Sequence, residues 1–203
     1  MSRRDRTARG ASLAELLVVL ALAGLLVGMG SLALASTARR QGALGAARGL
    51  AADIRFQRSV AIAQGRSRGL VLRELLGEWQ VSVVADGDGD GLRADDRRLG
   101  RDPLLEGPMS LSRRYGPVAP GFLPALDGLR TPPPGSRPLI DFDDPVRFGR
   151  SDVIAAGPGG GTSSGTIYLT DGASRQLAVV VAGSTGRVRL LEWDRATRSW
   201  QRR

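Results

Sequence analysis

Residues 11–35 read ASLAELLVVLALAGLLVGMGSLALA, and residues 16–35 of this stretch hold no charged side chain. Those 20 residues would form a helix about 30 Å long, which matches the hydrocarbon core of a bilayer. Residues 1–10 hold four arginines and one aspartate, and positive charge before an apolar segment favours a cytoplasmic N-terminus. The sequence therefore predicts one membrane-spanning helix over 16–35.

A cleaved secretory signal peptide is the main alternative, because it also combines a basic start with an apolar run. The apolar run here is longer than usual, and a helical pattern continues out of it without turn residues. Over residues 36–64 apolar side chains recur every three, four or seven positions, which predicts an amphipathic helix. Gly65 suits its C-terminal end. We therefore expect a single helix over residues 11–64.

Glycines interrupt the amphipathic part of this helix at residues 42, 45 and 49. Each weakens a helix by about 0.5–1 kcal/mol relative to alanine. Close packing through small residues is one explanation, and local melting during filament assembly is the other.

Beyond residue 65 the apolar pattern changes to the alternation of β-strands. The expected strands are 68–75, 79–84, 139–142, 146–148, 166–170, 176–182 and 187–193. Residues 110–138 hold seven prolines and predict a long irregular loop that lies on the sheet. The expected fold class is α+β, with a long N-terminal transmembrane helix packed on an antiparallel β-sheet domain over 65–203.

Composition excludes several kinds of catalysis. The 203 residues include 29 basic ones, all arginine, and no lysine, histidine or cysteine; the net charge is +9. Serine–histidine and cysteine–histidine nucleophiles, Schiff-base lysines, zinc sites of the Cys/His type and disulfides are thereby excluded. A carboxylate hydrolase built on Asp143 and Asp144 remains, but neighbours on a strand point to opposite faces. We expect a protein that is not an enzyme.

The segment Gly10-Ala11-Ser12-Leu13-Ala14-Glu15-Leu16 resembles the cleavage and methylation motif of type IV prepilins and type II secretion pseudopilins. The resemblance implies a basic leader over 1–10, which a membrane prepilin peptidase removes between Gly10 and Ala11. It also implies N-methylation of Ala11, where the family usually has phenylalanine. Glu15 would neutralise the new amine of a neighbouring subunit, which favours one register between helices because unpaired charges in lipid are costly.

Two motifs near the C-terminus narrow this resemblance. Gly165–Ile167 and Thr185–Arg189 resemble the closing strands of the minor pseudopilin H family of type II secretion and of the related FimT/FimU minor pilins. That family implies a pilin-like fold and a structural subunit near the tip of a periplasmic pseudopilus, supporting protein secretion. It further implies a single-pass inner-membrane protein with a periplasmic domain, whose partners are other pseudopilins or pilins. The sequence leaves open whether the filament is a pseudopilus or a type IV pilus.

An arginine-rich C-terminus gives the alternative function. Arg195, Arg198, Arg202 and Arg203 alternate with two tryptophans, and arginine with aromatic rings can hold a DNA backbone and stack on bases. FimT-type minor pilins have been linked to DNA capture. The other explanation is a solvated tail in a protein whose only basic residue is arginine.

Asp86, Asp88 and Asp90 have the spacing of the first ligands of a calcium loop, and Gly91 follows at the sixth position. The twelfth position is Arg97, where such loops have glutamate. Calcium is therefore the one cofactor that the sequence suggests, and a solvated hairpin loop is the alternative.

Overall fold

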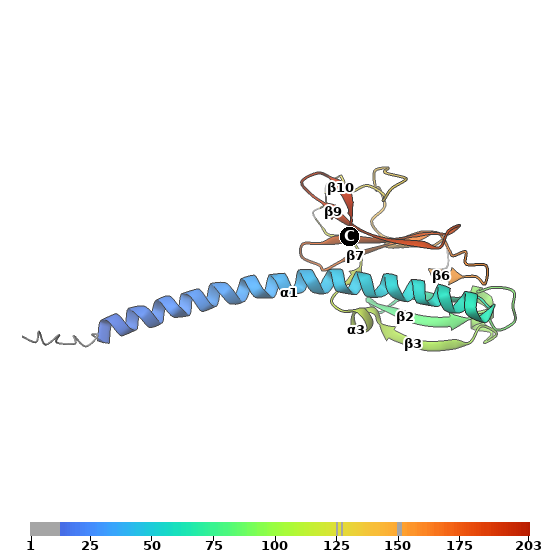
Figure 1. Ribbon diagram of the computed structural model, residues 1–203, viewed down its shortest axis with the longest axis horizontal. Coiled ribbons are helices and arrows are strands. Elements are labelled where there is room, and N and C mark those ends of the chain that lie inside the picture. Colours follow the sequence, from blue (N-terminus) through green and yellow to red (C-terminus); the bar gives the residue numbers. More distant parts are fainter. Residues whose placement is uncertain (1–12, 125, 127, 150–151) are drawn as a thin grey trace, which may run out of the picture. The chain divides into compact units, whose positions relative to one another are not determined.

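The protein is described by a computed structural model, which covers residues 13–124, 126, 128–149 and 152–203, without the side chains of residues 26–40 (Figure 1). The chain divides into two units between Ala38 and Arg39, and each is described by itself. The predicted leader over 1–10, the predicted cleavage site between Gly10 and Ala11 and the predicted N-methylation at Ala11 lie outside the described residues.

Helix α1 extends over Leu13–Gln64. It ends in a Schellman motif, in which Gly65 adopts a positive φ of 65°. The Arg66 N–H donates to the Ala61 carbonyl at 3.2 Å, and the Gly65 N–H donates to the Ile62 carbonyl at 3.4 Å. Glycine at this position thus ends the helix where the sequence predicts.

The described strands form two antiparallel sheets. The first sheet has the order β3-β2-β1-β6, with β1 over Arg68–Leu75, β2 over Glu78–Ala85, β3 over Leu104–Ser110 and β6 over Val153–Ala156. The turn Leu76–Gly77 joins β1 to β2, and both of its residues have positive φ, as in a type I′ hairpin. Helix α2 (Ala94–Arg98) lies between β2 and β3 in the sequence, and helix α3 (Leu111–Tyr115) follows β3.

The second sheet has the order β10-β9-β8-β7-β4, and β5 also pairs with β7. Its strands are β4 (Ala119–Pro120), β5 (Val146–Arg147), β7 (Gly165–Thr170), β8 (Gln176–Ala182), β9 (Arg187–Asp194) and β10 (Ser199–Arg202). The fold class is therefore α+β with antiparallel sheets.

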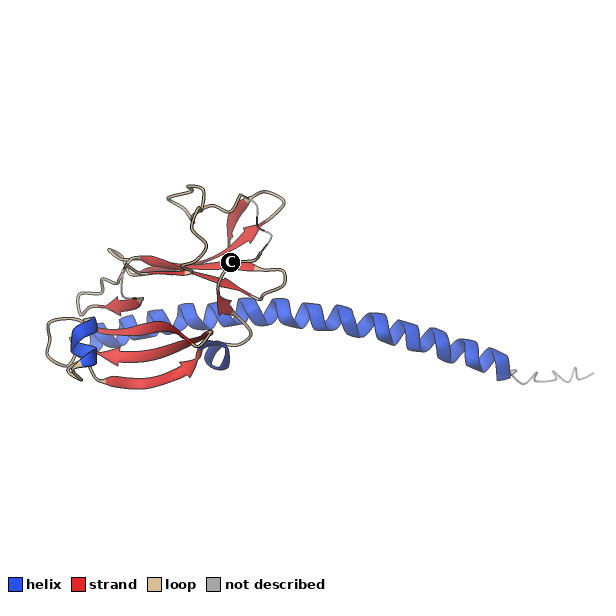
Figure 2. Ribbon diagram, turned by 180° about the vertical axis from the view of Figure 1, so that it is seen from behind, coloured by secondary structure: helices blue, strands red, loops and turns tan. Residues whose placement is uncertain are grey.

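Residues 43–54 of α1 supply one face of the main core, and strands of both sheets pack against them, as Figure 2 shows. The buried helical residues are mostly alanines, together with Leu50 and Ile54. Small side chains at these positions let strands of either sheet approach the helix closely. Of the helical face predicted from the sequence, Leu50 and Ile54 are thus buried between the two sheets, whereas Ile62 near the end of the helix is 47% exposed.

A second apolar cluster covers the outer face of the second sheet. Leu123, Leu126, Leu129 and Leu139 pack there on Tyr168 and Trp193. The proline-rich segment therefore lies on the sheet.

The strand expected over 139–142 is wrong. Among these residues Leu139 is buried in the second cluster, whereas Ile140 is 91% exposed and none belongs to a strand. Leu139 is held by a loop connection instead, since its N–H donates to the Leu129 carbonyl at 2.9 Å. The apolar run therefore covers the sheet without joining it.

Candidate functional site

Glu15 lies in the first turn of α1, where a negative charge is favoured by the helix dipole. Around it the apolar side chains from Leu13 to Leu25 are exposed; Leu13 is 78% exposed and Leu20 is 63% exposed. Of the predicted span over 16–35, residues 26–35 belong to the part whose side chains are not described. Within the part of the chain that is described, no helix has the length and hydropathy needed to cross a bilayer.

The four C-terminal arginines separate into two pairs. Arg195 and Arg198 lie in the exposed turn between β9 and β10, at the opposite end of β10 from Arg202 and Arg203. The Asp194 carboxylate organises that turn by accepting hydrogen bonds from the Thr197 hydroxyl and the Ala196 N–H, both at 2.9 Å. The hydrogen bond from the Thr197 hydroxyl has the larger effect on the pKa of Asp194, and both bonds lower it.

Arg202 and Arg203 instead meet arginines from distant parts of the sequence. Together with Arg48 and Arg55 of α1 and Arg189 of β9, they line a cavity of about 200 Å³, here called the arginine pocket. The C-terminus accordingly lies beside α1 in Figure 1. The sequence does not group these three arginines with the C-terminal ones, because they belong to α1 and β9, which only the fold brings to the end of β10.

The three aspartates of the predicted calcium loop do not form one cluster in the structure. Carboxylate oxygens of Asp86 and Asp88 lie near Asp102, whereas those of Asp88 and Asp90 lie near Asp96; each group has its oxygens within 4.8 Å of one another. Asp86, Asp96 and Asp102 are buried. Asp96 lies next to the twelfth position of the predicted loop, where the sequence already shows nearby acids, whereas Asp102 belongs to a later loop that the spacing could not identify.

Hydrogen bonds within the protein occupy much of this carboxylate set. Asp86 accepts the N–H groups of Gly89 at 2.7 Å and Gly91 at 2.9 Å. Asp102 accepts the Arg93 N–H at 3.0 Å, and Asp96 pairs with Arg101 at 3.0 Å. These carboxylates could supply calcium with oxygen ligands. The same oxygens already accept hydrogen bonds that hold the loop together, as expected for the alternative of a hairpin loop without calcium.

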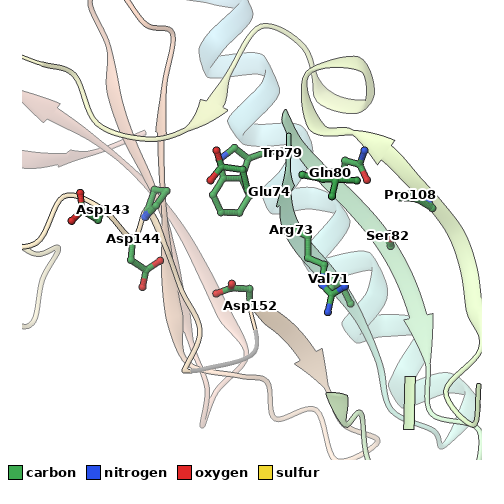
Figure 3. A pocket seen from close by; sticks show the side chains of 12 residues that line it. Val71, Arg73, Glu74, Trp79, Gln80, Ser82, Pro108, Asp143, Asp144 and Asp152 are labelled. Carbon is green, nitrogen blue, oxygen red and sulfur yellow. The ribbon is translucent and has the colours of Figure 1, made fainter. Parts of the chain in front are cut away.

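A cleft of about 700 Å³ lies beside β1 and β2, and Figure 3 shows the side chains that line it. Asp143, Asp144 and Asp152 line it opposite Arg73, and Trp79 closes one end. Burial, followed by the negative charge of Asp144, raises the pKa of Asp152. Asp143 and Asp144 both line this cleft, but they lie in the loop before β5, so the expectation that they are neighbours on a strand is wrong.

No family model, curated protein or solved structure matches this chain.

Proposed function

We propose that this protein is a minor pseudopilin, a structural subunit near the tip of a type II secretion pseudopilus with a pilin-like fold. The observation that carries the proposal is helix α1. It begins within three residues of the Gly10–Ala11 bond, exposes apolar side chains from Leu13 to Leu25, and buries one face of residues 43–54 against two antiparallel sheets. A helix that is apolar and exposed over one part and buried in a domain over another suits a subunit whose helix is covered by lipid or by other helices.

The C-terminal motifs agree with this proposal because each contains a glycine at a position where a larger residue would clash with the second sheet or its loops. A Cβ atom on Gly165 would lie 2.3 Å from the Arg147 carbonyl oxygen, so only glycine lets β5 approach the start of β7. Gly186 has a φ of 62°, and a Cβ atom there would lie 2.8 Å from the Gly160 carbonyl oxygen. Both motifs thus meet a packing demand of the second sheet.

In this proposal Glu15 is the acid that neutralises the N-terminal amine of a neighbouring subunit. The protein would sit in the bacterial inner membrane with a cytoplasmic N-terminus and a periplasmic domain. We expect Glu15→Ala to insert into the membrane as the unaltered protein does but to enter filaments less. Equal entry into filaments would contradict this role.

Mass spectrometry of the membrane-extracted chain, produced together with a prepilin peptidase, tests the proposal. We expect loss of residues 1–10 and addition of one methyl group to Ala11. A Gly10→Val control should keep the intact leader. An unaltered chain that also keeps residues 1–10, or is trimmed beyond residue 30, would contradict the proposal.

A DNA-binding minor pilin is the second candidate. The observation that favours it is that Arg202 and Arg203 line one cavity with Arg48, Arg55 and Arg189, so further basic residues lie near the end of the tail. This candidate predicts DNA binding that weakens steeply with salt and is lost in an Arg198→Ala/Arg202→Ala/Arg203→Ala variant. Protein secretion that depends on the chain, without DNA affinity, would decide for the pseudopilin.

A further inference from the structure

Strand β1 has an unpaired edge near its C-terminal end. Its neighbour β6 is short, and their pairing ends at Val71 and Val153, after which the Leu72 N–H still donates to the Asp152 carbonyl at 3.1 Å. Residues of a strand direct their N–H and C=O groups alternately to its two sides, so those of Glu74 point to the same side as those of Leu72. Within the described part of the chain no strand pairs with Glu74 on that side.

This free edge of β1 borders the cleft of about 700 Å³, here called the acidic cleft. Its described lining residues include four acids and one arginine: Glu74, Asp143, Asp144, Asp152 and Arg73. The ion pairs of the described part of the chain all involve other acids, so none of these four carboxylates is paired there. The cleft is therefore negative, although the chain as a whole has a net charge of +9.

Two of these carboxylates lie close enough together to repel each other. Burial, and after it the negative charge of Asp144, raises the pKa of Asp152, whereas the positive charge of Arg73 opposes this rise. Figure 3 shows Asp144 and Asp152 at the same opening as Glu74 and Trp79. A cation at this opening would relieve the repulsion, and an anion would add to it.

We propose that the acidic cleft binds an extended, basic segment of a partner protein, which pairs with the free edge of β1. An unpaired strand edge hydrogen bonds to an extended peptide by taking it up as a further strand, and the peptide's side chains supply the specificity. A residue opposite Glu74 in that strand projects to the same face as Glu74, so an arginine or lysine there meets a carboxylate. Half-buried Trp79, opposite Glu74 on β2, offers apolar surface to the stem of such a side chain. This inference rests on the cleft alone and does not require the pseudopilin proposal.

The test measures peptide binding to the full chain in an uncharged detergent by fluorescence polarisation. The probe is a short labelled peptide in which threonine and arginine alternate, so that its arginines share one face of a strand. We expect it to bind, and the same peptide with glutamine for arginine to bind about fivefold more weakly or worse. Non-specific attraction cannot imitate this preference, because the chain is basic overall.

Two double variants locate the site. Asp144→Asn/Asp152→Asn removes two charges of the cleft, keeps an oxygen to accept the Val146 N–H, and suits the φ of 49° at residue 152, which asparagine tolerates. We expect it to bind the probe about fivefold more weakly or worse. The control Asp88→Asn/Asp95→Asn removes the same charge from exposed residues after β2 and should bind the probe as the unaltered chain does. Equal affinity of the two double variants would overturn the proposal.

Two N-methylated probes test the pairing with β1 on the unaltered chain, so this arm does not depend on the folding of a variant. One probe is methylated at the threonine nitrogens and the other at the arginine nitrogens, which blocks one edge of the peptide strand or the other at constant charge. We expect one of them to lose binding and the other to keep it; equal affinity of both would overturn the pairing. Sedimentation of the chain alone examines the other occupant: self-association that Asp144→Asn/Asp152→Asn abolishes would assign the cleft to a second copy and overturn the proposal.

Discussion

Asp53 ties helix α1 to the segment that follows β3. Its Oδ2 accepts the Tyr115 hydroxyl at 2.6 Å and forms an ion pair with Arg114 at 2.9 Å. Arg114 also pairs with Glu106 of β3 at 2.9 Å. Burial, then the hydrogen bond to Asp53 and its negative charge, raise the pKa of Tyr115 well above its ordinary value. The neutral phenol is therefore the form that the folded protein stabilises.

This raised pKa predicts a loss of stability in alkali. Tyr115 in the unfolded chain loses its proton at about pH 10, and in the folded protein it does so at a higher pH. The stability that Tyr115 contributes is therefore fully present below about pH 10 and falls as the pH rises above that value. We expect the free energy of unfolding, measured with urea in detergent at about pH 8 and about pH 11, to fall less in Tyr115→Phe than in the unaltered chain. Burial also raises the pKa of Tyr168, so Tyr168→Phe serves as the matched comparison. If the free energy of unfolding falls as much between the two pH values in Tyr115→Phe as in the unaltered chain, Tyr115 is not the group responsible for the loss.

Asp86 is a buried acid whose hydrogen bonds hold the loop after β2. Because Asp86→Ala would leave the N–H groups of Gly89 and Gly91 without their acceptor, we expect it to lower the free energy of unfolding by about 1–3 kcal/mol. Asp88 is exposed and accepts a hydrogen bond from the Asp90 N–H at 3.4 Å. We therefore expect Asp88→Ala, measured in the presence of a chelator, to lower the free energy of unfolding less than Asp86→Ala does. Thermal melting of both variants checks this.

The same pair of variants tests calcium. If the loop binds calcium, about 1 mM calcium raises the melting temperature of the unaltered chain but not that of Asp88→Ala. No shift in the unaltered chain would dispose of the calcium hypothesis and leave the loop to its hydrogen bonds.

At the scale of the elements, the glycines of α1 differ in their surroundings. A Cβ atom on Gly42 would lie 2.9 Å from Cγ of Pro117, whereas a Cβ atom on Gly45 would meet nothing within 4 Å. Close packing thus explains Gly42 but not Gly45. We expect Gly45→Ala to raise the free energy of unfolding by about 0.5–1 kcal/mol, because alanine favours helix. Gly42→Ala should gain less or lose stability, since Pro117 must move.

Urea unfolding of the two alanine variants provides the measurement. Each adds one methyl group to the same helix, so helix propensity cancels in their difference. Equal stability of the two variants would show that the contact with Pro117 has no energetic weight.

Strands with a regular pattern could be predicted, and irregular ones could not. The strands predicted over 68–75 and 176–182 from their short apolar runs between glycine-containing turns correspond to β1 and β8 residue for residue. Strand β3 was not predicted because it contains Gly107 and Pro108, which are typical of turns, and because its pairing with β2 shifts register twice. Strand β6 has only the four residues Val153–Ala156, too few for a periodic pattern. The pairing of β6 with β1 depends on tertiary structure, which the local sequence does not determine.

At the scale of the whole molecule, residues 43–54 of α1 are shared by both sheets. Leu50 is fully buried in the core to which both sheets contribute. We expect Leu50→Ala to lower the free energy of unfolding by about 2–5 kcal/mol, since it leaves a cavity between the helix and the strands. Urea unfolding followed by circular dichroism would measure this loss. An exposed comparison on the same helix, Phe56→Ala, should cost less, and a similar cost for both would contradict the central role of Leu50.

The candidate sites likewise differ in whether their residues lie close together or far apart in the sequence. The Asp86–Asp90 spacing and the C-terminal arginines are visible in the sequence because their members are close together in it. The arginine pocket joins residues 48, 55, 189, 202 and 203, which only the packing of α1 beside β9 and β10 brings together. Its members could not be predicted without the register of those strands.

The chain has three tryptophans, and their positions give each sheet an optical reporter. Trp79 lies on β2, whereas Trp193 and Trp200 face each other on β9 and β10 with ring centroids 5.4 Å apart. Emission from Trp79→Phe would therefore report on the second sheet alone, and emission from Trp193→Phe/Trp200→Phe on the first sheet alone. The helix that both sheets share should make the two signals change together.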